Sequence, residues 1–182
     1  TKLMGKDGFY TNELTKILLP AELQKVDKTL RDIGLGSLAD EGIKAINRAA
    51  SQAVKEAKPI FVNAVKGITF ADAANILMGD KDAATNYLKQ RTQQELYNKF
   101  NPVIKESFAK VGADDIWSNI INHYNSIPLV NKINPDLTDY VTGEALKGVF
   151  TMIAVEENNI RTNVSHRSSD LLRRVFAMQD NK

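Results

Sequence analysis

The sequence predicts an all-α fold, a multi-helix bundle of about seven to nine helices preceded by an extended N-terminal arm. Apolar side chains recur every three or four positions along most of the chain, which is the period of a helix that buries one face. Glycines, prolines and helix-capping residues separate these stretches at short intervals. Apolar residues make up 43% of the chain, which supplies enough apolar surface for a packed core.

Residues 1–19 lack the helical period, and we expect them to form an extended arm with some strand character. A short helix near residues 11–17 is the alternative. The arm is expected to pack on a helical domain of residues 20–182. The two parts together are expected to make a single domain, because 182 residues are few for two.

Prolines and glycines divide the first half of the helical region. Pro20 suits the first turn of a helix, where its missing N–H costs nothing, and Gly34 is expected to end that helix. Ser37 is expected to cap the next helix. Pro59 disfavours helical backbone at the residue before it, so we predict a kink or a boundary at Lys58.

Capping residues and a further proline divide the middle of the chain. Thr69 and Asp72 have the spacing of a capping box and are expected to open a short helix. Asp80 or Asp82 is then predicted to cap a longer helix, which should end at Pro102 because proline cannot donate a helical hydrogen bond.

The last third of the chain is predicted to hold the longest helix. Asp114 is expected to cap the helix before it, and two prolines frame a loop over residues 127–136. The longest helix is predicted over residues 137–160, and its many apolar side chains place it at the centre of the bundle. An amphipathic helix around residues 171–176 is expected to close the chain against the core.

The composition excludes several classes of function. Basic residues number 24 and acidic residues 22, and the resulting net charge of +2 is too small to predict nucleic acid as a partner. No apolar run is long enough to span a membrane, and the absence of cysteine excludes thiolate chemistry. The chain begins at Thr1 rather than at methionine, so we expect that an upstream segment has been removed, for which a signal peptide is one candidate.

No motif predicts a cofactor, a metal ion or a catalytic residue. The sequence contains no phosphate-binding loop, no dinucleotide fingerprint and no G-x-S-x-G nucleophile turn. Neither His123 nor His166 has the spacing of a metal-binding pair, so both are interpreted as packed or surface histidines. These observations favour a non-enzymatic protein, although an enzyme of unknown class stays open.

The most suggestive polar group lies near the end of the longest predicted helix. Glu157 and Arg161 are four residues apart and share one side of that helix, with Glu156 beside them. They form either a buried ion pair lining a cleft, which an enzyme would use, or a solvated ion pair, and the solvated interpretation is favoured. The arginines that follow, Arg167 and Arg173 among them, are likewise interpreted as a solvated face.

Aromatic side chains support a further hypothesis. Trp117, Tyr124 and Phe150 occupy predicted helices and would line an apolar pocket between them. On this alternative, the protein carries an apolar ligand.

Several strings of residues occur in an order that is typical of one bacterial family. They are Asp7-Gly8-Phe9, Lys16-Ile17-Leu18-Leu19-Pro20, Ala57-Lys58-Pro59-Ile60-Phe61, Asp82-Ala83-Ala84-Thr85-Asn86-Tyr87-Leu88, Asp139-Tyr140-Val141-Thr142, Glu156-Glu157 with Ile160-Arg161, and Ser169-Asp170-Leu171-Leu172 before Val175-Phe176. Through these strings the chain resembles, from about Asp7 to Phe176, the family called domain of unknown function 4197.

The resemblance implies an α-helical protein of a family in which many members carry a signal peptide or a lipoprotein signal. It therefore implies export to the periplasm or outer cell envelope, with attachment through a missing N-terminal segment as one form. It implies no activity, no cofactor and no catalytic residue. Our leading hypothesis is a non-enzymatic envelope protein that binds a partner protein or a surface.

Overall fold

The computed structural model describes residues 2–32, 34, 36–110, 113–126, 128–129, 132, 134 and 136–180. Over these residues the chain forms eight α-helices and no strand, which confirms the all-α prediction. The α-helices are α1 (Ala21–Asp32), α2 (Gly36–Ala53), α3 (Ala57–Lys66), α4 (Phe70–Met78), α5 (Ala83–Lys110), α6 (Ala113–Asn125), α7 (Thr138–Thr162) and α8 (Asp170–Asp180). Short 3₁₀ helices cover Lys2–Met4, Val54–Glu56 and Val164–His166.

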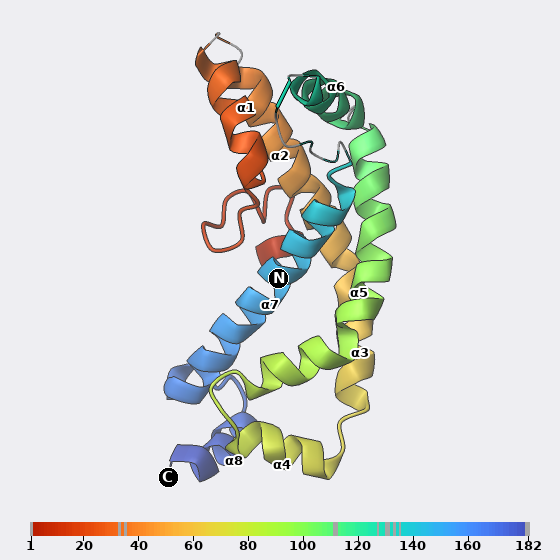
Figure 1. Ribbon diagram of the computed structural model, residues 1–182. Helices are drawn as coiled ribbons and strands as arrows, with labels where there is room; N and C mark the ends of the chain where they lie inside the picture. The colour runs from red at the N-terminus through yellow and green to blue at the C-terminus, as the bar shows by residue number, and fades with distance from the viewer. Residues whose placement is uncertain are drawn as a thin grey trace.

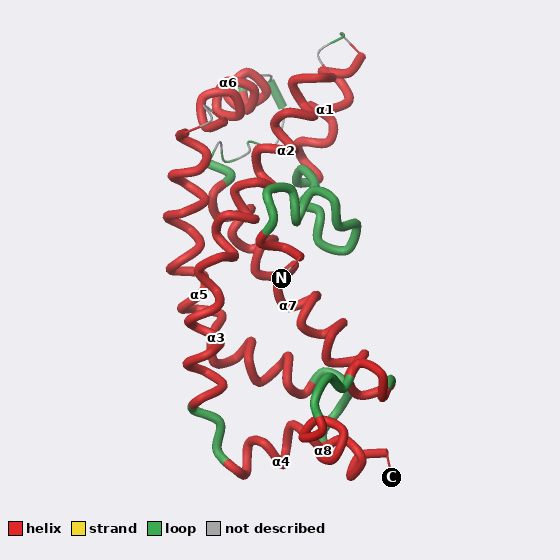
Figure 2. Tube along the Cα trace, turned by 180° about the vertical axis from the view of Figure 1, so that it is seen from behind, coloured by secondary structure: helices red, strands yellow, loops and turns green. Residues whose placement is uncertain are grey.

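The helices form an elongated molecule with two distinct ends (Figures 1 and 2). Helices α1 and α6 lie together at one end, beside the start of α2. Helices α4 and α8 lie at the other end, where α3 leads into α4. The two long helices α5 and α7 connect these ends and pack against each other, which places α7 centrally as predicted. The prediction that it is the longest helix is wrong, because α5 has 28 residues and α7 has 25; α5 gains this length by continuing through Pro102.

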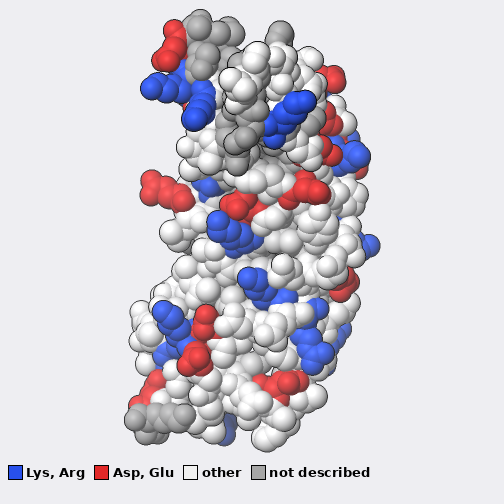
Figure 3. Space-filling view, in the orientation of Figure 1, with Lys and Arg blue, Asp and Glu red and all other residues white. Residues whose placement is uncertain are grey.

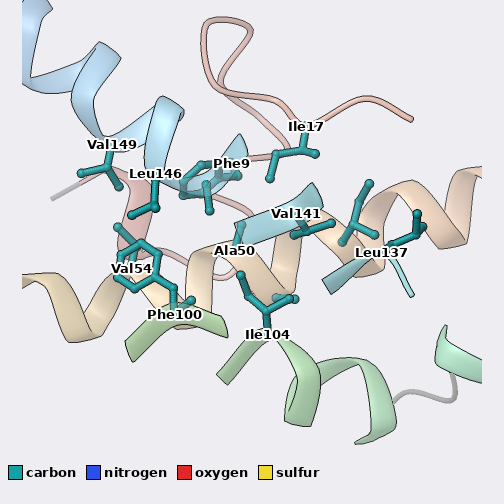
Figure 4. Close-up of a cluster of buried hydrophobic side chains, with 14 of the residues drawn as sticks. Phe9, Ile17, Ala50, Val54, Phe100, Ile104, Leu137, Val141, Leu146 and Val149 are labelled. Atoms are coloured by element: carbon teal, nitrogen blue, oxygen red, sulfur yellow. The ribbon is translucent and has the colours of Figure 1, made fainter. Parts of the chain in front are cut away.

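The core lies where the N-terminal arm, α2, α5 and α7 meet (Figure 4). Phe9 of the arm, Phe100 of α5 and Val141 of α7 are completely buried there. Ala49, Ala50 and Ala53 of α2 are also buried, and their small side chains allow α5 and α7 to approach α2 closely. The apolar stripes that predicted the helices are therefore the surfaces that form the core.

Phe9 and Ile17 of the arm are buried in the core, and the described part of the arm has turns and a short 3₁₀ helix in place of strand character. The amide side chain of Asn47 on α2 forms the two backbone hydrogen bonds that a neighbouring strand would otherwise supply. It accepts a hydrogen bond from the Ile17 N–H at 2.8 Å and donates one to the Ile17 carbonyl at 2.8 Å. A buried asparagine thus satisfies the backbone of a segment that has no strand partner.

The two internal prolines have different effects. Before Pro59, the chain tightens into the 3₁₀ turn Val54–Glu56, so the predicted boundary exists and lies just before Lys58. The predicted end at Pro102 is wrong, because α5 continues through this residue to Lys110. Phe100 and Ile104 on either side of the proline are completely buried, and this packing holds the helix together despite the missing hydrogen bond.

Two glycines on α7 allow a direct test of core packing. A Cβ atom on Gly148 would lie 2.7 Å from Cε1 of the buried Phe9, whereas a Cβ atom on Gly143 would meet nothing within 4 Å. We expect Gly148→Ala to lower the free energy of unfolding by about 1–3 kcal/mol through overpacking. Gly143→Ala should raise it by about 0.5–1 kcal/mol, because alanine favours the helix. Urea denaturation of both variants measures these changes, and equal effects would contradict the assigned packing of Phe9.

Candidate functional site

Glu157 of α7 is buried, with 6% of its surface exposed, and it caps the start of α5. Its carboxylate accepts hydrogen bonds from the N–H groups of Ala84 and Thr85 at 2.9 and 2.8 Å, and from the Thr85 hydroxyl at 2.7 Å. The first N–H groups of a helix have no partner within the helix and carry partial positive charge. Asp82 directly precedes α5, as expected for its cap, and its carbonyl accepts the Asn86 N–H, but the acceptor for the N–H groups of Ala84 and Thr85 is a carboxylate from a distant helix.

Arg161 lies one turn further along α7 and caps the end of α4. Its guanidinium donates to the Ile76 and Leu77 carbonyls at 2.6 and 3.2 Å, and to the side-chain oxygen of Gln179 on α8 at 3.0 Å. Two further donors bond the carboxylate of Glu157, at 2.8 and 3.0 Å. These contacts use all five N–H donors of the arginine. The favoured interpretation as a solvated ion pair is therefore wrong, and the pair is buried.

Arg167 caps the C-terminal end of α7, the same end that carries Glu157 and Arg161, and is itself buried, with 2% of its surface exposed. Its Nε donates to the Ile160 carbonyl at 2.9 Å and its Nη2 to the Arg161 carbonyl at 3.1 Å. The remaining contacts are to the carboxylate of Asp180, the last residue of α8. The prediction that this arginine belongs to a solvated face is wrong, whereas Arg173 is exposed as predicted.

Glu157, Arg161 and Arg167 form what we call the capping hub. Each of its charges faces a helix terminus of opposite partial charge, so each charge is stabilised where it lies. The ring of Phe176 on α8 lies within 6 Å of both guanidinium groups, at 5.8 Å from Arg161 and 5.5 Å from Arg167. The capping hub therefore joins α4, α5, α7 and α8 at a single place.

The hydrogen bonds of the capping hub also fix the charge of Glu157. Burial raises the pKa of this carboxyl group, but hydrogen bonds from Ala84, Thr85 and Arg161 outweigh burial, and the pKa lies below its ordinary value. Glu156 points to solvent and has no place in the hub. Over the part of the chain that the structure describes, no three carboxylate or imidazole groups lie close enough to hold a metal ion.

Two of the three predicted pocket residues, Trp117 and Phe150, pack against different helices. Trp117 of α6 is buried against α2, where a Cβ atom on Gly42 would lie 2.4 Å from the indole ring. Phe150 of α7 is buried against Phe61 of α3, with ring centroids 6.1 Å apart in an edge-to-face arrangement. The side chain of Tyr124 lies outside the described residues.

The end formed by α3, α4 and α8 exposes a group of large apolar side chains that we call the apolar end. Its residues are Val62, Val65, Phe70, Met78, Leu171 and Met178. Phe70 is 92% exposed at the start of α4, and Leu171 is 70% exposed at the start of α8. Neither α4 nor α8 has a fully buried side chain: each helix has partly buried apolar residues on one side and exposed ones on the other, while the capping hub holds both helices in place.

Charged side chains of both signs lie around the apolar end. Lys66, the last residue of α3, is exposed, and so are Asp80 and Lys81 in the turn that follows α4. On α8, Asp170 and Arg173 form an exposed ion pair at 3.0 Å. Figure 3 shows the same interspersion of basic and acidic side chains over the face of the whole molecule. The rim of the apolar end is therefore mixed in charge, without one dominant sign.

Sequence reasoning did not predict the apolar end. Leu171 belongs to the helix that was expected to close against the core, and Val65 has helical spacing to other apolar residues, but both are exposed. One signal was present in the sequence: residues 62–79 contain only two charged side chains, Lys66 and Asp72. Asp72 is used within the predicted capping box, which the structure confirms, so this stretch presents a single exposed charge.

The fold and the site together define an all-α protein in which a buried cluster of charged residues holds α4 and α8 at one end of the molecule, where apolar side chains are exposed. A family model described as "Protein of unknown function (DUF4197)" matches residues 1–177. The chain belongs to this family, as its sequence strings indicated. No curated protein and no solved structure gives a significant match.

Proposed function

We propose that this chain is a non-enzymatic binding protein that docks a partner protein through the apolar end. The observation that carries the proposal is the concentration of exposed apolar side chains on α3, α4 and α8, with Phe70 almost completely in solvent. Large exposed apolar groups gathered at one place mark interaction sites, whereas isolated ones are ordinary. An exposed aromatic ring on a rigid helix terminus is also the kind of anchor that dominates protein interfaces.

The mixed charge of the rim favours a protein as the occupant. Protein interfaces combine an apolar centre with a polar rim of both signs. An anionic membrane would be attracted by Lys66 and Arg173 but repelled by Asp80 and Asp170. The expected partner therefore presents an apolar pocket for the Phe70 ring, flanked by charges that complement this rim.

The capping hub supports the same proposal from the interior. It leaves no free donor on Arg161, and it keeps Glu157 ionised against three donors at the start of α5, so its groups are committed to holding the helices together. A docking surface benefits from such rigid support, because less conformational entropy is lost on binding. Because the family resemblance implies export, the partner is expected in the periplasm or outer cell envelope. Fractionation of the cells before crosslinking tests this location.

A membrane is the alternative occupant that the experiment must separate. Among the described residues, no single helix is long and apolar enough to cross a bilayer. Residues 39–66 and α4 satisfy the criterion only when taken together, across a bend of 106°. Binding to vesicles therefore enters the test as a competing outcome.

Photo-crosslinking followed by measured binding tests the proposal. A photoreactive phenylalanine analogue at Phe70 should give a discrete adduct with one protein, whereas the same analogue at Leu14, an exposed site on the arm, should not. The identified protein, once purified, should bind the unmodified chain and the Leu14→Glu control equally. Phe70→Glu should weaken that binding by about tenfold or more.

Three results would overturn the docking proposal. The first is equal affinity of the partner for the unmodified chain and for Phe70→Glu. The second is binding to phosphatidylglycerol-containing vesicles that Phe70→Glu abolishes, which would assign the apolar end to membranes. The third is self-association in sedimentation experiments that the same substitution abolishes, which would assign it to a second copy of the chain. Circular dichroism confirms that each variant is folded.

A further inference from the structure

A groove of about 510 Å³ lies on the opposite part of the molecule from the apolar end, along α2. Residues 5 and 6 of the arm, α2, the last turn of α5 and the indole of Trp117 on α6 line it. Gly5, Gly42 and Ala45 leave the groove open because they carry small side chains or none. Its volume falls in the range of sites that bind small organic molecules.

The groove concentrates positive charge in a chain that is nearly neutral. Five basic residues line it and one acidic residue, Glu41, faces them. The basic residues are Lys6, Lys44, Arg48, Lys55 and Lys110. Over the whole chain the corresponding numbers are 24 and 22, so this excess is local.

Part of this charge is already neutralised and part is not. Arg48 pairs with Asp7 at 2.8 Å, and Lys110 pairs with Glu106 at 2.7 Å. Lys44 and Lys55 form no salt bridge with any described residue; Lys55 bonds only the amide oxygen of Gln52, at 2.6 Å. Lys44 and Lys55 lie on the same side of α2 and the turn that follows it, about 16 Å apart along the axis, so they mark two separate points along one groove.

Trp117 supplies a second, independent observation. Its side chain is 2% exposed, and its Nε1–H group is buried without an acceptor among the described residues. Buried donors in folded proteins are nearly always paired, so an unpaired one in the wall of a groove indicates a missing acceptor. The indole ring also offers a flat apolar surface beside the lysines.

We propose that this groove binds a small molecule carrying a phosphate group, with the phosphate against Lys44 or Lys55 and the organic portion lying along α2 against Trp117. Lysine ammonium groups bind phosphate as compact point charges with several donors. An oxygen on the organic portion of the ligand would accept the hydrogen bond that Nε1 of Trp117 lacks. The ligand is either a soluble phosphate compound or the head group of a phospholipid, and the two sources share this chemistry.

The fluorescence of Trp117 reports on the groove directly, because the chain contains one tryptophan. Pyrophosphate represents the soluble source, and short-chain phosphatidic acid below its micelle concentration represents the lipid source. Short-chain phosphatidylcholine, which carries no net charge, is the control ligand. We expect saturable fluorescence changes with pyrophosphate, with phosphatidic acid or with both, and a decrease in affinity as salt increases.

A matched pair of double variants decides whether the lysines of the groove are responsible. Lys44→Gln with Lys55→Gln should weaken binding by about tenfold or more. Lys81→Gln with Lys89→Gln removes the same charge at exposed positions outside the groove and should leave the affinity unchanged. Binding of pyrophosphate alone identifies a soluble ligand, and binding of phosphatidic acid alone identifies a lipid. Absence of a saturable change with either, or equal weakening in both double variants, would overturn the proposal.

Discussion

Replacing Arg161 by methionine should destabilise the protein by about 3–5 kcal/mol, the range found when one partner of a buried ion pair is removed. The substitution keeps an unbranched side chain of similar reach but leaves the Glu157 carboxylate buried without its countercharge, and it leaves the Ile76 and Leu77 carbonyls without their donors. Urea denaturation followed by far-ultraviolet circular dichroism measures the change in the free energy of unfolding.

Arg173→Met is the matched control for this prediction. Arg173 pairs with Asp170 at a similar spacing along a helix, but both side chains are exposed, so its loss should change stability by at most about 0.5 kcal/mol. A double variant that replaces Glu157 with leucine and Arg161 with methionine should lose less than the sum of the two single variants, because no unpaired charge remains buried. Equal effects of Arg161→Met and Arg173→Met would show that the capping hub contributes little to stability.

The second large effect is expected in the core. Phe100 of α5 is completely buried among the arm, α2 and α7, and Phe100→Ala should lower the free energy of unfolding by about 3–5 kcal/mol. The loss combines the apolar surface that is no longer buried with the cavity that the ring leaves behind. Urea denaturation again provides the measurement, and the slope of the transition should stay unchanged if the variant folds normally.

The same substitution at Phe70 is the control. Its ring is 92% exposed, so Phe70→Ala should alter stability by no more than about 0.5 kcal/mol. A similar loss at the two positions would mean that the apolar end is covered by other parts of the chain in solution. Such a result would also remove the main argument for docking through that end.

The helices themselves could be predicted because their signals are local. The period of apolar residues, Pro20 and the capping box of Thr69 and Asp72 each act over a few residues, and the structure confirms the helices that they predict. The effect of Pro102 was predicted incorrectly because the loss of a helical hydrogen bond at proline can be read from the local sequence. The packing of Phe100 and Ile104, which offsets that loss, involves segments distant in the sequence.

The candidate site could be predicted only in part, for the same physical reason. The spacing of Glu157 and Arg161 correctly predicts that they pair. Their burial depends on contacts with α4, α5 and α8, whose contacting residues lie between 18 and 85 positions away in the sequence. Arg167 was assigned to solvent because charge usually lies there, although its five donors suit the free carbonyls of a helix end. Exposure of Phe70 likewise depends on how the last helices pack, and no local pattern shows it.

The position of the two caps on α7 also fixes how that helix sits lengthwise in the molecule. Glu157 bonds the N-terminal end of α5 and Arg161 bonds the C-terminal end of α4. The two residues are about one helical turn, or about 5.4 Å, apart along α7. If α7 moved by one turn along its axis, the Glu157 carboxylate would face the carbonyls at the end of α4, and Arg161 would have no carbonyl partner. Both contacts would therefore be lost together. The buried charges therefore select one axial position of α7 among several that the packing of its apolar face alone would allow.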